Sequence, residues 1–88
     1  MAVDAEILVE ILNKLDDSID ELVAQQKFQD WTEMEGFLDV QYDSRLASIL
    51  KGKSSNIDDL DYGMKDKITT RKKRLFAHLE QAFQKGEI

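Results

Sequence analysis

Residues 4–27, DAEILVEILNKLDDSIDELVAQQK, decide the fold of this 88-residue chain. Leucine and isoleucine recur there at alternating steps of four and three, the spacing of one buried face on an amphipathic helix. The pattern predicts a long helix over residues 4–27, with Asp4 as its amino-terminal cap. The buried stripe consists of Leu8, Leu12, Leu15, Ile19 and Leu22, and it is flanked by Ile7, Ile11 and Val23.

A second helix is predicted over residues 31–50. Asp30 comes just before it and Glu33 follows three residues later, which is the spacing of a capping box. Gly52 follows as a left-handed helix stop. Gly36 lies inside this helix, so either a neighbouring helix approaches closely there or the chain tolerates the glycine. The expected stripe is Trp31, Met34, Leu38, Tyr42, Leu46 and Ile49, with Phe37 and Leu50 beside it and Val40 away from it.

A third helix is predicted over residues 57–85, with Gly86 as its stop. Ser55 and Asp58 form a cap-like pair at its start, and Gly63 marks a point where a short first helix gives way to a longer one. The stripe consists of Ile57, Leu60, Met64, Ile68, Leu75, Leu79 and Ala82, with Phe76 and Phe83 alongside. Long helices with short connections predict one all-α domain over residues 1–88, a small antiparallel three-helix bundle.

Composition and motifs argue against catalysis. The chain has no cysteine, which excludes a disulfide scaffold, a thiolate zinc site and a cysteine nucleophile. His78 is the single histidine, and neither a glycine-rich phosphate loop nor a nucleophile elbow is present. We therefore expect no enzyme, no cofactor and no metal. No apolar run approaches the roughly 20 residues of a membrane span, so we expect no membrane insertion and a cytoplasmic location.

The two parts of the chain carry opposite charge. Residues 1–50 hold 12 acidic and 3 basic side chains, whereas residues 51–88 hold 6 acidic and 9 basic ones. The net charge of −6 argues against general nucleic-acid binding, which needs a basic face. The basic run Arg71–Arg74 is interpreted as pairing with the acidic first helix. The alternative is a docking strip for an acidic partner or for phosphates, and the acidic helices could also mimic DNA.

The number of large apolar side chains exceeds what the inner face of a small bundle covers. The surplus predicts an exposed apolar patch, which is typical of a protein–protein surface. We expect a helix laid in a groove, supplied by a second copy or by a different protein. The residues expected to form this surface are Leu75, Phe76, Leu79, Phe83, Phe37 and Val40. The alternative is a homodimer: a self-associating bundle that serves as a small regulator or a phage or plasmid accessory protein.

The stretch ELVAQQKFQDW over residues 21–31, followed by a helix that carries Glu35 and Arg45, resembles the FliT-type flagellar export chaperone family of bacteria. The basic-then-leucine character of residues 68–79 is similar to a later helix of that family. The resemblance implies a chaperone that binds a flagellar filament-cap subunit before export and shields its apolar helical end. We expect this chain to lack the further carboxyl-terminal helix that modulates partner binding in the family.

Overall fold

The first helix begins where the sequence predicts. In the computed structural model, which describes residues 3–87, α1 spans Ala5–Gln25. The Asp4 carboxylate accepts a hydrogen bond from the Ile7 N–H at 2.8 Å and so satisfies one of the free amides of the first turn. The predicted end at residue 27 is two residues too late, because Gln26 already has an extended backbone.

The second helix, α2, spans Trp31–Gly52 and has the predicted cap. The Asp30 carboxylate accepts from the Glu33 N–H at 2.8 Å, and the Glu33 carboxylate reaches back to the Gln29 N–H at 3.2 Å. Gly52 remains helical, so the prediction of a left-handed stop at this residue is wrong. Ser54 takes the left-handed conformation instead, with φ of 58°.

The third predicted helix is divided, but not at Gly63. A short 3₁₀ turn, η1, spans Ile57–Asp59, and α3 spans Tyr62–Gln84. The break lies at Leu60, whose extended backbone lets its side chain enter the core at 6% exposure, and at Asp61, which caps α3. The predicted division near Gly63 is therefore present, but it lies at Leu60 and Asp61, two to three residues before the glycine. Gly86, with φ of 76°, follows the helix as predicted.

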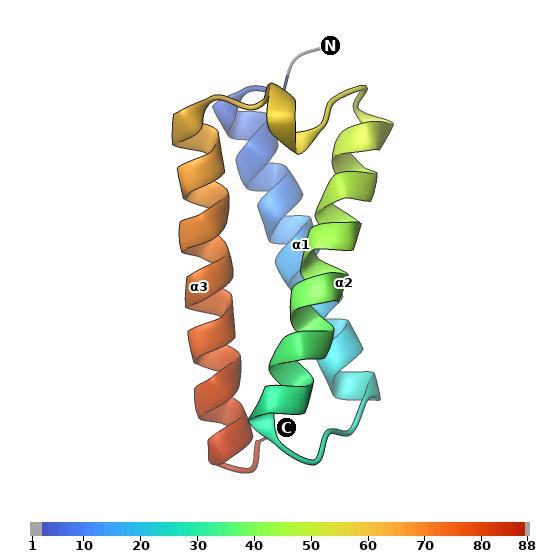
Figure 1. Ribbon diagram of the computed structural model, residues 1–88, viewed down its shortest axis with the longest axis vertical. Coiled ribbons are helices and arrows are strands. Elements are labelled where there is room, and N and C mark those ends of the chain that lie inside the picture. Colours follow the sequence, from blue (N-terminus) through green and yellow to red (C-terminus); the bar gives the residue numbers. More distant parts are fainter. Residues whose placement is uncertain (1–2, 88) are drawn as a thin grey trace.

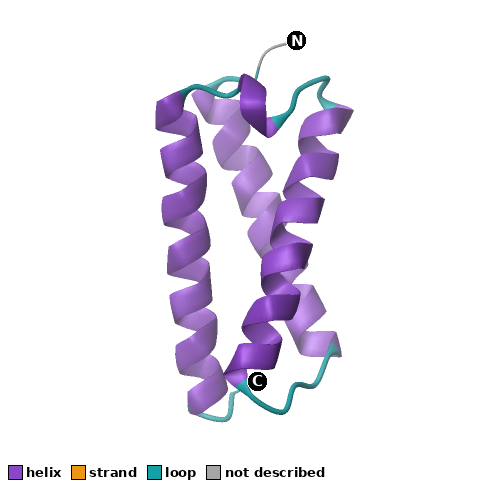
Figure 2. Cartoon of the chain, viewed as in Figure 1, coloured by secondary structure: helices purple, strands orange, loops and turns teal. Residues whose placement is uncertain are grey.

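The three helices form an antiparallel bundle in which all three contact one another (Figure 1). α1 descends in the view, α2 rises and α3 descends again, and short connections join them. Helices and loops make up the described residues 3–87, and no strand is found among them (Figure 2). The prediction of a small all-α three-helix bundle is confirmed. Within residues 3–87, no helix combines the length and apolar character needed to cross a membrane.

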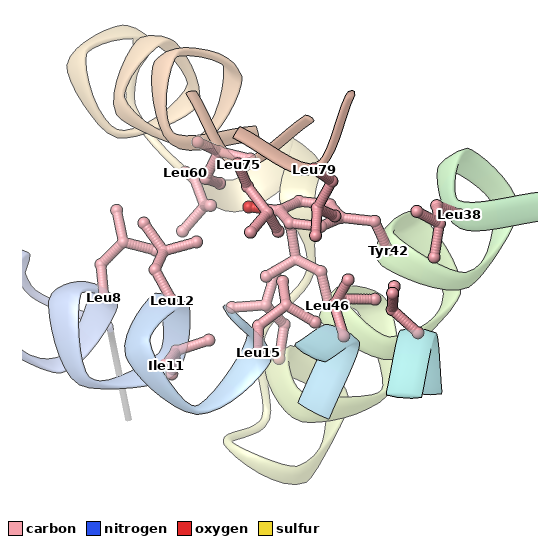
Figure 3. Close-up of a cluster of buried hydrophobic side chains, with 14 of the residues drawn as sticks. Leu8, Ile11, Leu12, Leu15, Leu38, Tyr42, Leu46, Leu60, Leu75 and Leu79 are labelled. Atoms are coloured by element: carbon pink, nitrogen blue, oxygen red, sulfur yellow. The ribbon is translucent and has the colours of Figure 1, made fainter. Parts of the chain in front are cut away.

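The core consists of leucine, isoleucine, valine, methionine and one tyrosine, contributed by all three helices. Figure 3 shows the part of it around Tyr42. Several stripe positions differ from the prediction. Val23 is buried in place of Leu22, and Leu50 in place of Ile49, while four further stripe residues are only partly buried: Trp31, Ile57, Met64 and Ala82. The buried residues of α2 thus follow a spacing of four throughout: Met34, Leu38, Tyr42, Leu46 and Leu50. This spacing turns the buried face by about 40° per step, so α2 leans across its neighbours (Figure 1).

Leu15 tests the register of α1. Its side chain is completely buried in the core, so Leu15→Ala leaves a cavity and should lower the free energy of unfolding by about 2–5 kcal/mol. In a domain of this size such a loss unfolds most of the protein at moderate temperature. Thermal unfolding followed by circular dichroism measures the effect. A melting temperature equal to that of Lys14→Ala, an exposed control one residue away, would contradict the register.

Candidate functional site

A groove of about 730 Å³ runs between α2 and α3. α2 packs more closely against α1 than against α3, so the α2–α3 side of the bundle stays open. Charged residues from both helices rim the groove. Its apolar and small lining residues are Trp31 and Gly36 from α2, and Ile68, Phe76 and Ala77 from α3.

Aromatic side chains hold the walls of the groove in place. The Trp31 indole N–H donates to the Glu35 carboxylate at 3.1 Å, which fixes the ring across one helical turn. The same ring packs against Phe83, with ring centroids 6.4 Å apart. Phe76 packs edge to face on the buried Tyr42 at 6.1 Å. The groove therefore has a preformed aromatic surface rather than a set of loose side chains.

Lys72 links the two walls. Its ammonium forms ion pairs with Asp39 and, at 3.1 Å, with Asp43, both on α2. The same ammonium lies 5.7 Å from the ring centroid of Phe76, within the range of a cation–π contact. Burial lowers the pKa of Lys72, but the hydrogen bonds and charges of the two aspartates outweigh it, so the pKa lies above its ordinary value. Lys72 thus stays charged and joins α3 to α2.

Two contacts set the register across the groove. Trp31 meets Phe83 and Asp39 meets Lys72, and because the helices are antiparallel, Gly36 lies near the level of Ala77. A Cβ added at Gly36 would meet nothing within 4 Å. Gly36 costs the helix about 1 kcal/mol relative to alanine, and no close neighbour within the described chain accounts for it.

Acidic side chains dominate the rim. Four carboxylates line the groove and are opposed by the ammonium groups of Lys72 and Lys73. Lys72 is already paired with Asp39 and Asp43. Glu35 and Glu80 form no ion pair among residues 3–87, and they flank the level of Gly36 from the two walls. The lower half of the groove is therefore an apolar surface between two uncompensated carboxylates.

The side chains of the basic run Arg71–Arg74 point in different directions: one pairs with α1, one pairs with α2, and two are exposed. Arg71 donates to the Asp16 carboxylate at 2.8 Å and to the Asn13 side chain at 3.0 Å, which confirms the predicted pairing with the first helix. Lys72 pairs with α2 instead. Lys73 and Arg74 are exposed. A continuous docking strip over residues 71–74 is therefore not formed, because consecutive helical residues point in different directions.

The structure corrects two of the predicted binding residues. Leu75 and Leu79 are 9% and 4% exposed and lie in the core beside Tyr42 (Figure 3), so they form no open surface. They occupy the helix face that points at α1 and α2, whereas Phe76, one residue along, points into the groove.

The other predicted residues lie apart from one another. Phe37 is half-buried and packs on Phe28 at 5.5 Å. Phe83 lines a smaller hollow of about 260 Å³ at the end of the bundle. Val40 is 65% exposed but does not line the groove. Of the six predicted residues, only Phe76 lines the main groove.

Sequence reasoning missed Trp31, Gly36, Ile68 and Ala77 as groove residues. The sequence places both Trp31 and Ile68 in buried stripes: Ile68 is buried in the core as predicted and also reaches the groove, whereas Trp31 is only partly buried. Gly36 did carry a signal, because a glycine inside a helix needs either a close neighbour or a tolerant position. Ala77 carried no such signal, because alanine is common on every face of a helix.

Tyr42 is a polar group enclosed in the core. Its ring is fully buried, and its hydroxyl finds no hydrogen-bond partner among the described residues. One oxygen of Asp16 is likewise buried and unpaired, although its other oxygen binds Arg71. Burial, followed by the negative charge of Asp16, raises the pKa of Tyr42 to about 12. The hydroxyl therefore stays neutral at physiological pH.

This raised pKa predicts a loss of stability at alkaline pH. Above pH 10 a tyrosine in the unfolded chain loses its proton, while Tyr42 in the folded protein keeps its proton up to about pH 12. The folded state then binds more protons, so the free energy of unfolding falls as pH rises through this interval, by up to about 3 kcal/mol. Tyr42→Phe should reduce the fall. At neutral pH it should raise the free energy of unfolding by about 1 kcal/mol, since it removes an unpaired buried hydroxyl.

Urea unfolding of both proteins at neutral pH and at about pH 11 measures this difference. The pKa of Lys72 is also raised, so Lys72 likewise lowers the free energy of unfolding as pH rises, and it does so in both proteins. This contribution accounts for the pH dependence that remains in the variant. An equal loss of stability in the Tyr42→Phe variant would show that Tyr42 does not control the alkaline transition.

The described residues contain no group of three or more histidine, cysteine, aspartate or glutamate side chains placed to hold a metal ion. What the groove offers is an apolar surface with oriented charges, which suits the binding of another polypeptide. No family model, curated protein or solved structure matches this chain.

Proposed function

We propose that this chain is a small protein-binding module that holds an apolar helical segment of a different protein between α2 and α3. The observation that carries the proposal is the open groove, with Trp31 and Phe76 on its walls. A helix laid there would complete a four-helix arrangement and bury these rings, which is the helix-in-groove mode of recognition.

The charge of the groove favours a different protein over a second copy. Each copy carries a net charge of −6, and the carboxylates of Glu35 and Glu80, which form no ion pair within residues 3–87, flank the groove. In a symmetric dimer formed through this face, the same acidic patch would meet itself, and like charges oppose association. A self-associating bundle remains the rival outcome of the experiments below.

The resemblance to FliT-type flagellar export chaperones supports a specific form of the proposal. In that form, the bound segment is the apolar helical end of a flagellar filament-cap subunit. Holding it in the groove would shield its apolar face from aggregation before export, and burial of that face would supply most of the binding free energy. Charges along the rim would orient the segment and speed its encounter with the groove.

Trp31 makes the proposal directly measurable. It is the single tryptophan of the chain and it lines the groove, so a tryptophan-free segment that binds there changes its fluorescence. Titration with the helical end of a filament-cap subunit from the same organism should give a saturable shift in emission. Light scattering across concentration should show a species at the 10.2 kDa mass of one chain. A species of twice that mass and no fluorescence response would favour the self-associating bundle.

Phe76→Glu tests the wall of the groove. The side chain is only partly buried, so the variant should keep its helical circular dichroism spectrum while affinity for the segment falls at least about tenfold. Val40→Glu adds the same charge to an exposed apolar position outside the groove, and it should change affinity by no more than about twofold. Phe76→Ala serves as a second variant if glutamate disturbs the fold. Equal affinities in the two glutamate variants would contradict binding in this groove.

A further inference from the structure

Three observations meet at one level of the groove. Gly36 on α2 and Ala77 on α3 lie near the same level, and both are exposed. No atom of residues 3–87 comes within 4 Å of a Cβ added at Gly36. Glu35 and Glu80 flank this level from opposite walls without an ion-pair partner in the described residues. The open space over Gly36 therefore lies close to the two lining carboxylates that form no ion pair within residues 3–87.

We infer that the groove takes a basic amphipathic helix, and that this helix comes closest to the chain at Gly36 and Ala77, between the carboxylates of Glu35 and Glu80. The inference rests on the proposed function and names the chemistry of the partner. Small residues let two helix backbones approach closely, and here both walls are small at one level. The flanking carboxylates pair with lysine or arginine at the edges of the incoming apolar face.

The position of Lys72 limits where the basic residues lie. Its ammonium is ion-paired with Asp39 and Asp43, one to two turns above Gly36, and Lys73 adds a second positive charge to the rim, so the two lysines match these two aspartates in charge. The partner's basic residues therefore belong beside Glu35 and Glu80, and its large apolar residues beside Trp31 and Phe76. At the level of Gly36 the partner brings its own backbone close, which requires that α2 carry no side chain there.

The same geometry explains why a destabilising glycine lies inside α2. A glycine inside a helix is less stable than alanine, and nothing within the described chain occupies the space above Gly36. A side chain at residue 36 would therefore raise the stability of the free protein and lower its affinity for the partner. A side chain added there strengthens the helix and obstructs the groove.

Two synthetic peptides provide the probes. Each is tryptophan-free and about 20 residues long, which spans about 30 Å as a helix. Both carry the same leucine and alanine face, and the edges of that face are lysine in one peptide and glutamate in the other. Fluorescence of Trp31 reports binding. The lysine-edged peptide should bind, more weakly at high salt, and the glutamate-edged peptide should not. Equal binding of both would overturn the inferred basic character.

Substitutions at the closest level test the approach itself. Gly36→Leu and Ala77→Leu should each lower affinity for the lysine-edged peptide by about tenfold or more, because each fills the space the helix needs. Ala47→Leu, on an exposed part of α2 outside the groove, should leave affinity unchanged. Gly36→Ala should raise the melting temperature by about 4–8 °C while weakening binding. Gly52→Ala, at the end of α2, is the control for the effect of glycine on the helix alone.

The outcomes separate this inference from the proposed function. Wild-type affinity in both Gly36→Leu and Ala77→Leu, together with loss of affinity in Phe76→Glu, would overturn the close approach at Gly36 and keep the groove as a binding site. No response of Trp31 to either peptide or to the filament-cap segment would overturn both. Reduced affinity in the two groove variants, with no change in Ala47→Leu, would support the inference.

Discussion

The four-residue spacing of buried side chains along α2 is the constraint on which the rest of the structure depends. From Met34 to Leu50 each step turns the buried face by about 40°, so α2 cannot present one straight stripe to both neighbours. It leans, packs closely along α1, and leaves its side toward α3 open. The gap in apolar packing is spanned by Lys72, which reaches from α3 to two aspartates of α2. The groove is thus a consequence of how the core is packed.

The features that weaken the free protein gather around this groove. Aromatic rings remain partly exposed, Gly36 makes α2 less stable than alanine would, and the carboxylates of Glu35 and Glu80 have no ion-pair partner within residues 3–87. A partner helix laid across α2 and α3 would offset each of these features. It would bury the rings, lie close to the chain at the glycine, and give the carboxylates basic partners. An exposed apolar patch is typical of protein–protein surfaces, and this arrangement supports the proposed binding role.

Local signals in the sequence predicted the helix starts well and the division of the last helix less well. Asp4 and Asp30 cap their helices as expected, because a cap depends only on residues three positions apart. Gly63 was the visible breaker in the third segment, yet the chain breaks at Leu60 and Asp61. There an aspartate able to cap a new helix follows a leucine that the core can accept. A glycine just inside a helix is tolerated when a stronger cap precedes it.

The sequence by itself determined that the chain makes three helices in one bundle, since apolar periodicity and caps act over a few residues. It also favoured pairing of the basic run with the acidic first helix, which Arg71 makes with Asp16. Only the tertiary structure decided which neighbours within a stripe face the core and which face the groove. Leu75 and Phe76 differ by one position, or about 100° around the helix, and either could be buried until the lean of α2 is known. Helix orientation is a sum over many weak packing contacts between distant residues, and no local pattern encodes that sum.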